Sequence, residues 1–293
     1  MANSIESVVT MLGEIADRVY GHDSISAVLD TQGVQIATEF GSAKTVKVPK
    51  MVTSGLGDYS ATNGYSAGDA TLSFVPYTLT KDRGKKFTLD AVENIDSAGV
   101  ALSMLSSTFI RTQVVPELDA YRFAQYATHA GTKATTALDE TSVIPAIDTA
   151  RASLFEAGAP EDNLILFVST SCYTALKNAS DKLRWGTGTV INREVETFDG
   201  VPVVKVPSAR FQSAVTLGTD GFTNPSSALA INFILMDKDA VLQIVKHNPA
   251  NLITPDANQS ADGWLYKYRV YHDALVKDGK SKGIYAHTAP KAG

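Results

Sequence analysis

The spacing of apolar residues along the chain changes between helical and extended patterns, which indicates an α+β fold. Residues 4–20 carry apolar side chains every three or four positions, with acidic residues on other faces, and this predicts an amphipathic helix. We expect Ser4 to cap the helix and Gly21 to end it. A helix of this length at one end of the chain could cover a neighbouring molecule as easily as its own core.

Two stretches of alternating apolar and polar residues flank a glycine-rich segment. The first begins at Lys44 with KTVKVPKM, whose proline suits an edge strand, and the second ends at Asp90. Between them, residues 54–70 are almost free of aliphatic side chains and cannot bury a core. We predict one long hairpin that projects from the body. Because an isolated two-stranded hairpin is only marginally stable in water, we expect it to lie on another subunit.

The longest helical pattern covers residues 96–130, with Asp96 as its expected cap. If continuous, these residues would extend over about 50 Å, which is typical of a structural spine. Pro116 lies inside the pattern and should kink or break the helix near Val115, because proline lacks an N–H and clashes with the preceding turn. We expect a bend that sets the curvature of the subunit; the alternative is two helices that meet at Val115.

Residues 141–206 have the alternating pattern of an α/β region. A helix with Thr141 or Ser142 as its cap and Gly158 as its stop precedes NLILFVS, a continuous apolar run that predicts a buried strand. The stretch TSCYTALKNAS predicts a second helix.

The remaining patterns are extended. Asp199-Gly200 is the strongest turn signal in the chain and predicts a hairpin. Residues 228–236 predict another buried strand, and residues 264–276 alternate strictly. One face of that last strand carries Trp264, Tyr266, Tyr268 and Val270, and the other carries Lys267 and Arg269.

The composition of the 293 residues excludes several classes of protein. Apolar residues make up 44% and charged residues 19%, which is typical of a globular chain. A single cysteine, Cys172, excludes a disulfide framework. No apolar run approaches the length of a membrane span. The net charge of −5 argues against a dedicated nucleic-acid binder but allows a protein that encloses nucleic acid.

The candidate chemistry is sparse, and we expect no catalytic residue, cofactor or metal site. The chain has no nucleophile elbow, Walker loop or zinc-protease motif. Cys172 has no nearby histidine and is best interpreted as a packing residue. His272 and Asp273 could form a base and its orienting partner, but adjacent strand residues face opposite sides. Asp237 and Asp239 could bind a cation, although a solvated turn is favoured.

One basic cluster stands out, and it falls on the return arm of the predicted hairpin. It could touch nucleic acid, but its position on a projecting arm favours contact with an acidic protein surface. With the two tyrosines of the glycine-rich segment, the candidate inter-subunit contacts are Tyr59, Tyr65, Lys81, Arg83, Lys85 and Lys86.

The order and content of these segments resemble the major capsid proteins of tailed bacteriophages, which have the Hong Kong-97 fold. The matching features are the N-terminal arm, the long hairpin, the helix containing VVPELDAYRF and the α/β region. The pieces FDGVPVVKVPSARF and ILMDKDAVLQIVKHNPANLITPD resemble the versions in phages of Gram-positive hosts. The resemblance covers residues 40–275 and rests on serial order rather than on a single motif.

The resemblance implies a division of the chain and a function. The implied parts are an N-terminal arm (1–43), an E-loop hairpin (44–90), a P-domain with the spine helix and its kink at Pro116 (91–138), an axial α/β A-domain (139–235), and P-domain return strands with a C-terminal tail (236–293). Subunits of this family assemble in the host cytoplasm into hexamers and pentamers of an icosahedral shell. In the virion that shell encloses double-stranded DNA without reading its sequence.

Two departures from the founding member change what the resemblance implies. Only about 40 residues precede the hairpin, so a separate scaffolding protein, or none, is implied; a portal and a decoration protein are further implied partners. Residues 55–70 contain no lysine, so we expect no covalent cross-links between subunits. The alternatives are an encapsulin-type nanocompartment shell and a small-molecule enzyme built on the α/β region.

Overall fold

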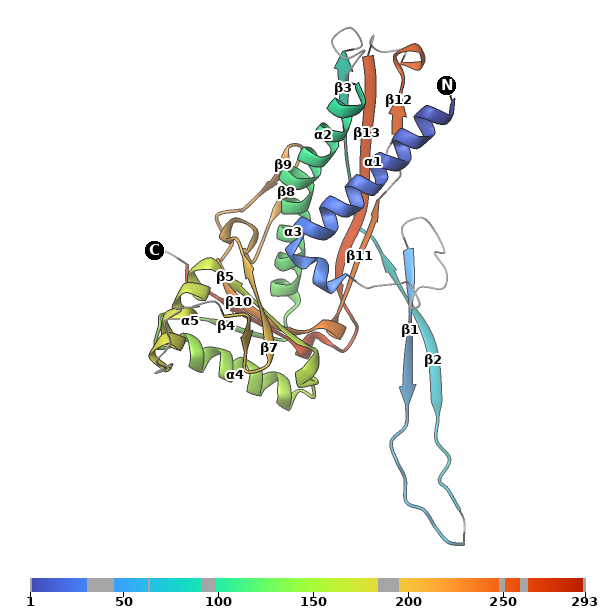
Figure 1. Ribbon diagram of the computed structural model, residues 1–293. Helices are drawn as coiled ribbons and strands as arrows, with labels where there is room; N and C mark the ends of the chain where they lie inside the picture. The colour runs from blue at the N-terminus through green and yellow to red at the C-terminus, as the bar shows by residue number, and fades with distance from the viewer. Residues whose placement is uncertain are drawn as a thin grey trace, which may run out of the picture.

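A computed structural model describes residues 2–30, 45–62, 64–90, 98–183, 195–247, 251–258 and 263–291. It has three parts: an elongated spine of helices beside a long sheet, an α/β body at one end of the spine, and a projecting hairpin (Figure 1). The expected cap Asp96 lies outside the described residues, as does most of the connection between the N-terminal helix and the hairpin.

The N-terminal helix α1 (Ala2–Asp23) is longer than expected at both ends. Ser4 lies inside it rather than capping it, and Gly21 lies in its last turn rather than ending it. A helical glycine costs about 1 kcal/mol relative to alanine. Contacts around the glycine outweigh that cost, because Tyr20 is buried in the spine core and Asp23 pairs with Arg111 at 2.6 Å.

The projecting hairpin is shorter than predicted. Strands β1 (Thr45–Thr53) and β2 (Ala70–Thr78) pair antiparallel along their whole length. The predicted return arm was wrong beyond this point, because β3 (Lys81–Asp90) leaves the hairpin and pairs with β13 (Gly263–Val276). The chain is redirected at Thr80, whose N–H and hydroxyl both donate to Asp273 at 2.8 Å.

The spine sheet is built around β13. Strand β3 lies on one side of it, and β11 (Val241–His247) and β12 (Asn251–Ile253) lie on the other. The predicted alternation is confirmed: Tyr266, Tyr268 and Val270 are buried against the helices, while Lys267 and Arg269 are exposed. Burying three large side chains on one face at about 1.5–3 kcal/mol each fixes the register of this strand.

The long spine helix has three successive segments: α2 (Ala98–Phe109), a π-helical turn (Ile110–Val114) and α3 (Val115–His129). Pro116 lies in the first turn of α3. The helix therefore continues through the proline, but it departs from regular α-helical geometry just before it. In the π turn, the N–H of Val115 donates to the carbonyl of Ile110, five residues back. A wider turn directly before a proline accommodates its ring and its missing donor.

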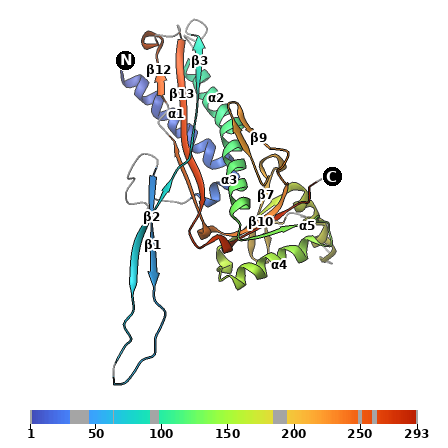
Figure 2. The same ribbon diagram turned by 180° about the vertical axis from the view of Figure 1, so that it is seen from behind.

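The α/β body is a six-stranded sheet with helices α4 (Val143–Glu156) and α5 (Thr170–Leu183) on one face and the spine helix α3 on the other (Figures 1 and 2). In spatial order, its strands are β4 (Thr132–Thr135), β14 (Ile284–Thr288), β10 (Ile231–Asp237), β5 (Leu164–Ser169), β7 (Val201–Val206) and β6 (Thr197–Phe198). Strand β14 therefore lies in the body, although its position in the sequence suggested a peripheral tail.

Short elements connect these parts. The hairpin of β8 (Thr216–Gly218) and β9 (Gly221–Thr223) reaches from the body toward the spine. The 3-10 helices are Ile25–Leu29, Glu161–Asn163, Ser208–Arg210, Lys238–Ala240, Pro255–Ala257 and Ser281–Gly283.

Among the described helices, none is both long and apolar enough to cross a membrane.

Two predicted turns of the body are confirmed. Gly158 has φ = 80° at the end of α4, the left-handed conformation that glycine adopts without strain. Asp199 and Gly200 have φ values of 48° and 83°, as a two-residue hairpin between β6 and β7 requires.

The predicted cap position of α4 is confirmed, because Ser142 is its N-cap residue, but the Ser142 side chain makes no capping hydrogen bond. One carboxylate oxygen of Asp139 accepts the N–H groups of Thr141 and Ser142 at 2.9 and 2.8 Å. The same oxygen accepts both of their hydroxyls, at 2.7 and 2.8 Å. The hydroxyls therefore act as donors instead of capping the helix themselves, and these bonds hold the pKa of Asp139 below its ordinary value.

Replacing Asp139 should destabilise the start of α4. We expect Asp139→Ala to lower the urea midpoint of unfolding, while Asp148→Ala, on the exposed side of the same helix, leaves it unchanged. Because the pKa of Asp139 is lowered on folding, its contribution is full above pH of about 4 and is lost as the pH falls below that value. Equal midpoints for the two variants at pH 7 would contradict this assignment.

Candidate assembly interface

The β1–β2 hairpin exposes apolar side chains that its own subunit does not cover. Directly opposed residues of an antiparallel pair point to the same side, so Met51 shares one face with Leu72, and Pro49 with Phe74. Met51, Leu72 and Phe74 keep between 52% and 65% of their surface exposed. At about 1.5–3 kcal/mol for each side chain, covering this face would supply substantial association energy.

Only the base of the hairpin is buried. On its opposite face Val46 and Val48 pack against Leu242 of the spine sheet, with Tyr77 partly buried beside them. Lys50 also pairs with Asp278 at 2.7 Å, and beyond it the two strands project away from the spine, as Figure 2 shows. The buried base fixes the direction in which the hairpin leaves the spine.

The tip of the hairpin, residues 54–69, is ordered around a pair of tyrosines. Ser60 and Gly64 exchange two backbone hydrogen bonds of 3.1 and 2.7 Å, and Gly64 has φ = 75°. These bonds hold the rings of Tyr59 and Tyr65 with their centroids 5.1 Å apart and their planes at 60°. We call this arrangement the tyrosine clasp. Tyr65 is 90% exposed, so the tip presents a preformed aromatic surface.

The predicted basic contacts do not lie on the hairpin, because all four belong to β3 in the spine sheet. Arg83 binds both carboxylate oxygens of Glu117 at 2.6 and 3.0 Å, and Lys85 pairs with Asp220 at 2.6 Å. Lys81 lies 5.2 Å from the centre of the Tyr121 ring. The acidic surface expected for these residues is therefore partly supplied within the subunit, while Lys86 stays exposed.

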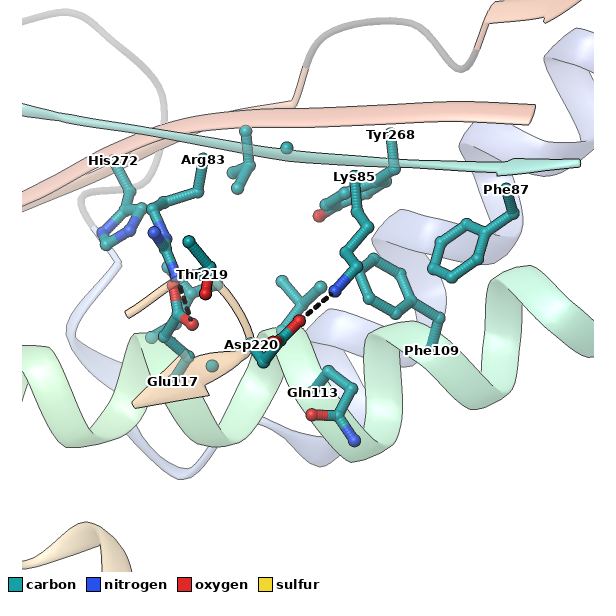
Figure 3. Close-up of a pocket in the computed structure, with 15 residues that line it drawn as sticks. Arg83, Lys85, Phe87, Phe109, Gln113, Glu117, Thr219, Asp220, Tyr268 and His272 are labelled. Carbon is teal, nitrogen blue, oxygen red and sulfur yellow. Dashed lines mark hydrogen bonds and ion pairs between the residues drawn. The ribbon is translucent and has the colours of Figure 1, made fainter. Parts of the chain in front are cut away.

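A pocket of about 240 Å³ lies where the β8–β9 hairpin crosses β3 and the π turn (Figure 3). Phe87, Phe109 and Tyr268 line it, and the Arg83–Glu117 and Lys85–Asp220 pairs lie at its rim. The guanidinium of Arg83 also donates to the carbonyl of Gly218 at 2.6 Å. The Arg83–Glu117 pair links two elements of the spine, whereas the Lys85–Asp220 pair and the Arg83–Gly218 bond join the β8–β9 hairpin to the spine.

The other candidate groups have structural roles. Cys172 is buried, and burial raises the pKa of its thiol to about 12. The carboxylate of Asp273 accepts from the Tyr121 hydroxyl at 2.9 Å in addition to Thr80. Asp237 caps the short turn after β10 by accepting the N–H of Asp239 at 3.0 Å. Among the residues that the structure describes, no three acids, cysteines or histidines are grouped to hold a metal.

Sequence reasoning missed a buried polar cluster that anchors the segment ahead of the hairpin. Asp119 of α3 is fully buried and accepts the hydroxyls of Ser24 and Ser26 at 2.8 and 2.6 Å. Its carboxylate also accepts the backbone N–H groups of Ile25 and Ser26 at 3.2 Å. One side chain of the spine thereby holds the start of the Ile25–Leu29 helix.

Arg122, one turn further along α3, completes the cluster and is also fully buried. Its guanidinium donates to the Tyr20 hydroxyl and to Ser26 Oγ, both at 2.7 Å. Gln243 of β11 donates to the carbonyl of Ser26 at 2.8 Å and accepts from Tyr126 at 2.6 Å. A buried charge of either sign is tolerated only when it is paired and hydrogen-bonded. Asp119 pairs with Arg210 at 3.3 Å and Arg122 with Asp30 at 3.4 Å, and only Nε of the Arg122 guanidinium has no hydrogen-bond partner among the described residues.

The comparisons with known proteins agree on a fold rather than on a sequence family. No protein-family model matches the chain, and no curated protein matches it either. Solved structures do match. The capsid of cyanophage P-SCSP1u has 16% identity and a TM-score of 0.59, covering 86% of this chain and 85% of that one.

Two further structures match over a similar extent. A structure of Gordonia phage Cozz has 15% identity and a TM-score of 0.59, and the match covers 92% of this chain and 87% of that chain. The mature capsid of bacteriophage PhiM1 has 11% identity and a TM-score of 0.57, with 86% and 83% covered. The chain therefore has the fold of phage capsid proteins, and the predicted α+β class and capsid fold are confirmed.

Removing the buried cation should be far more damaging than removing an exposed one. We expect Arg122→Met to cost about 3–5 kcal/mol in the free energy of unfolding, because the oxygens of Tyr20 and Ser26 lose their buried donor and Asp30 loses its cation. Arg111→Met, which removes a 63% exposed partner of Asp23, should cost less than about 1 kcal/mol. Urea denaturation measures both variants, and similar losses would mean that the buried cluster does not anchor the fold.

Proposed function

We propose that this protein is the major capsid protein of a tailed phage, a structural protein without a catalytic role. Many copies would close into hexamers and pentamers of an icosahedral shell, and each would be a component of the virion. The observation that carries the proposal is the β1–β2 hairpin, whose exposed apolar face lies within a fold shared with phage capsids. In a shell, neighbouring copies would cover that face.

In the proposed shell, the hairpin and the rest of the subunit have different roles. The contact of Val46 and Val48 with Leu242 and the contact of Thr80 with Asp273 hold the base of the hairpin on the spine. The hairpin is free to reach a neighbour, while the spine and the α/β body keep their own cores. During assembly, the parts proposed from the sequence, from the N-terminal arm to the axial domain, would behave as rigid bodies. The hairpin would join them to the neighbouring subunit.

The other partners follow from the same proposal. Double-stranded DNA would be enclosed without sequence-specific contacts, which the net charge of −5 supports, since a shell must release its DNA. Assembly in the host cytoplasm would proceed with a separate scaffolding protein or with none, and a portal and a decoration protein are the further proposed partners. Tyr59, Tyr65 and the lysines of β3 are the proposed inter-subunit contacts.

Deleting residues 58–68 tests the proposal directly. The deletion removes the tyrosine clasp but no residue of the buried core, so the subunit should keep its circular dichroism spectrum and melting temperature. Shells and capsomers, which we expect from the intact protein, should be lost because the hairpin no longer engages a neighbour.

Electron microscopy and size-exclusion chromatography separate the outcomes. Normal shells from the deletion variant would contradict the role of the hairpin. An intact protein that elutes only as a small oligomer would favour an enzyme. Particles that enclose a cargo enzyme rather than nuclease-protected DNA would favour an encapsulin-type compartment.

Pro116 should affect the geometry of assembly more than the stability of the subunit. Pro116→Ala supplies an N–H and allows the π turn to relax toward a regular helix, so the melting temperature should stay the same or rise. The relaxed spine would change the curvature of the subunit and give shells of wrong or mixed diameter. Unchanged diameter and yield would show that this proline does not control curvature.

A further inference from the structure

Two lysines face each other on the outer surface of the spine sheet. Lys86 of β3 and Lys267 of β13 are direct partners in the antiparallel register, and both are exposed. Their side chains lie on the same side of the sheet, about 5 Å apart at Cβ, where like charges destabilise the pairing. Within the described residues, no acidic side chain pairs with either lysine.

Three of the four neighbouring cations on the same two strands are matched by an acid, and the fourth, Lys81, lies 5.2 Å from the centre of the Tyr121 ring. Arg269 binds the carboxylate of Asp82 at 2.8 and 2.7 Å. Arg83 and Lys85 point toward the helices and hold Glu117 and Asp220 (Figure 3). The Lys86–Lys267 pair is thus an exception among well-paired charges, and its repulsion would be relieved by a carboxylate from outside the subunit.

The tip of the hairpin has the complementary chemistry. Residues 51–80 contain no lysine or arginine, and their only charged side chains are those of Asp58 and Asp69. Both acids are exposed, and Asp58 is next to the tyrosine clasp. The exposed rings of Tyr59 and Tyr65 offer faces that attract ammonium groups. The tip therefore combines negative charge with aromatic surface on an ordered backbone.

The tip cannot reach the lysine pair of its own chain. The nine paired residues of β1 and β2 extend over about 30 Å and lead away from the spine sheet, as both views show (Figures 1 and 2). A second copy of the chain has no such restriction.

We propose that the hairpin tip of one subunit docks on the Lys86–Lys267 pair of a second copy. Asp58 and Asp69 would neutralise the two ammonium groups, and the tyrosine clasp would lie against their stems. The inference rests on the proposed function and names the surface that receives the hairpin. Charge complementarity gives such a contact its specificity, because a carboxylate is required where two cations repel.

Charge exchange tests this contact. Reversing the tip (Asp58→Lys with Asp69→Lys) or the sheet (Lys86→Glu with Lys267→Glu) should lower the yield of shells and capsomers at least tenfold. Combining the two reversals should restore the yield to within about threefold of the unaltered protein, because opposite charges meet again. As a matched control, Lys280→Glu with Lys282→Glu makes the same charge change on an exposed turn and should leave the yield unchanged.

A disulfide supplies a direct readout of the contact. In particles carrying Asp58→Cys and Lys267→Cys, oxidation should give a ladder of linked subunits on a denaturing gel, while Asp58→Cys with Lys282→Cys should not. The native Cys172 is buried and does not interfere.

Four results would overturn the inference: full yield from the sheet reversal, no rescue in the combined variant, an equal loss in the control, or the absence of the ladder. Loss of DNA retention with normal assembly would assign the lysines to DNA and would equally overturn it. If the unaltered protein forms no shells, the proposed function fails instead, so the two failures can be told apart.

Discussion

The hairpin of β1 and β2 imposes the constraint on which the rest of the structure depends. A two-stranded ladder whose outer half has no core of its own gains little from folding alone. Here the ladder carries Met51, Leu72 and Phe74 on one uncovered face, and the tyrosine clasp lies at its tip. In the proposed shell a neighbour would cover that face, and association would then be part of the folded state of the subunit.

One short stretch of the spine helix contacts chain segments that lie before and after the hairpin in the sequence. Asp119 and Arg122 bind the segment ahead of β1, and Tyr121 shares Asp273 with Thr80 after β2. The π turn with Pro116 lies directly before this stretch. A change in the helix at the π turn would therefore reach Thr80, where the chain leaves the hairpin, through Tyr121 and Asp273.

Local patterns predicted the elements better than their partners. The alternation at Tyr266, Tyr268 and Val270 identified both a strand and its buried face, because period two is a property of the strand alone. The same alternation could not show that β3 pairs with β13 rather than with β1, since pairing is decided by distant residues. The roles of Asp119 and Arg122 could not be predicted, because polar residues on a helix usually mark its solvent-exposed face. Helix α3 is buried on nearly all sides, so its polar residues lie in the core instead.

Hydrogen–deuterium exchange of the outer half of the hairpin tests the central claim most directly. The amides of residues 50–53 and 70–74 should exchange at least ten times more slowly in assembled shells than in dissociated subunits, because a neighbour then holds the ladder closed. The amides of β13 should be equally protected in both and serve as the internal reference. Equal protection of the hairpin in the two states would contradict the account, since the hairpin would then be stable without a partner.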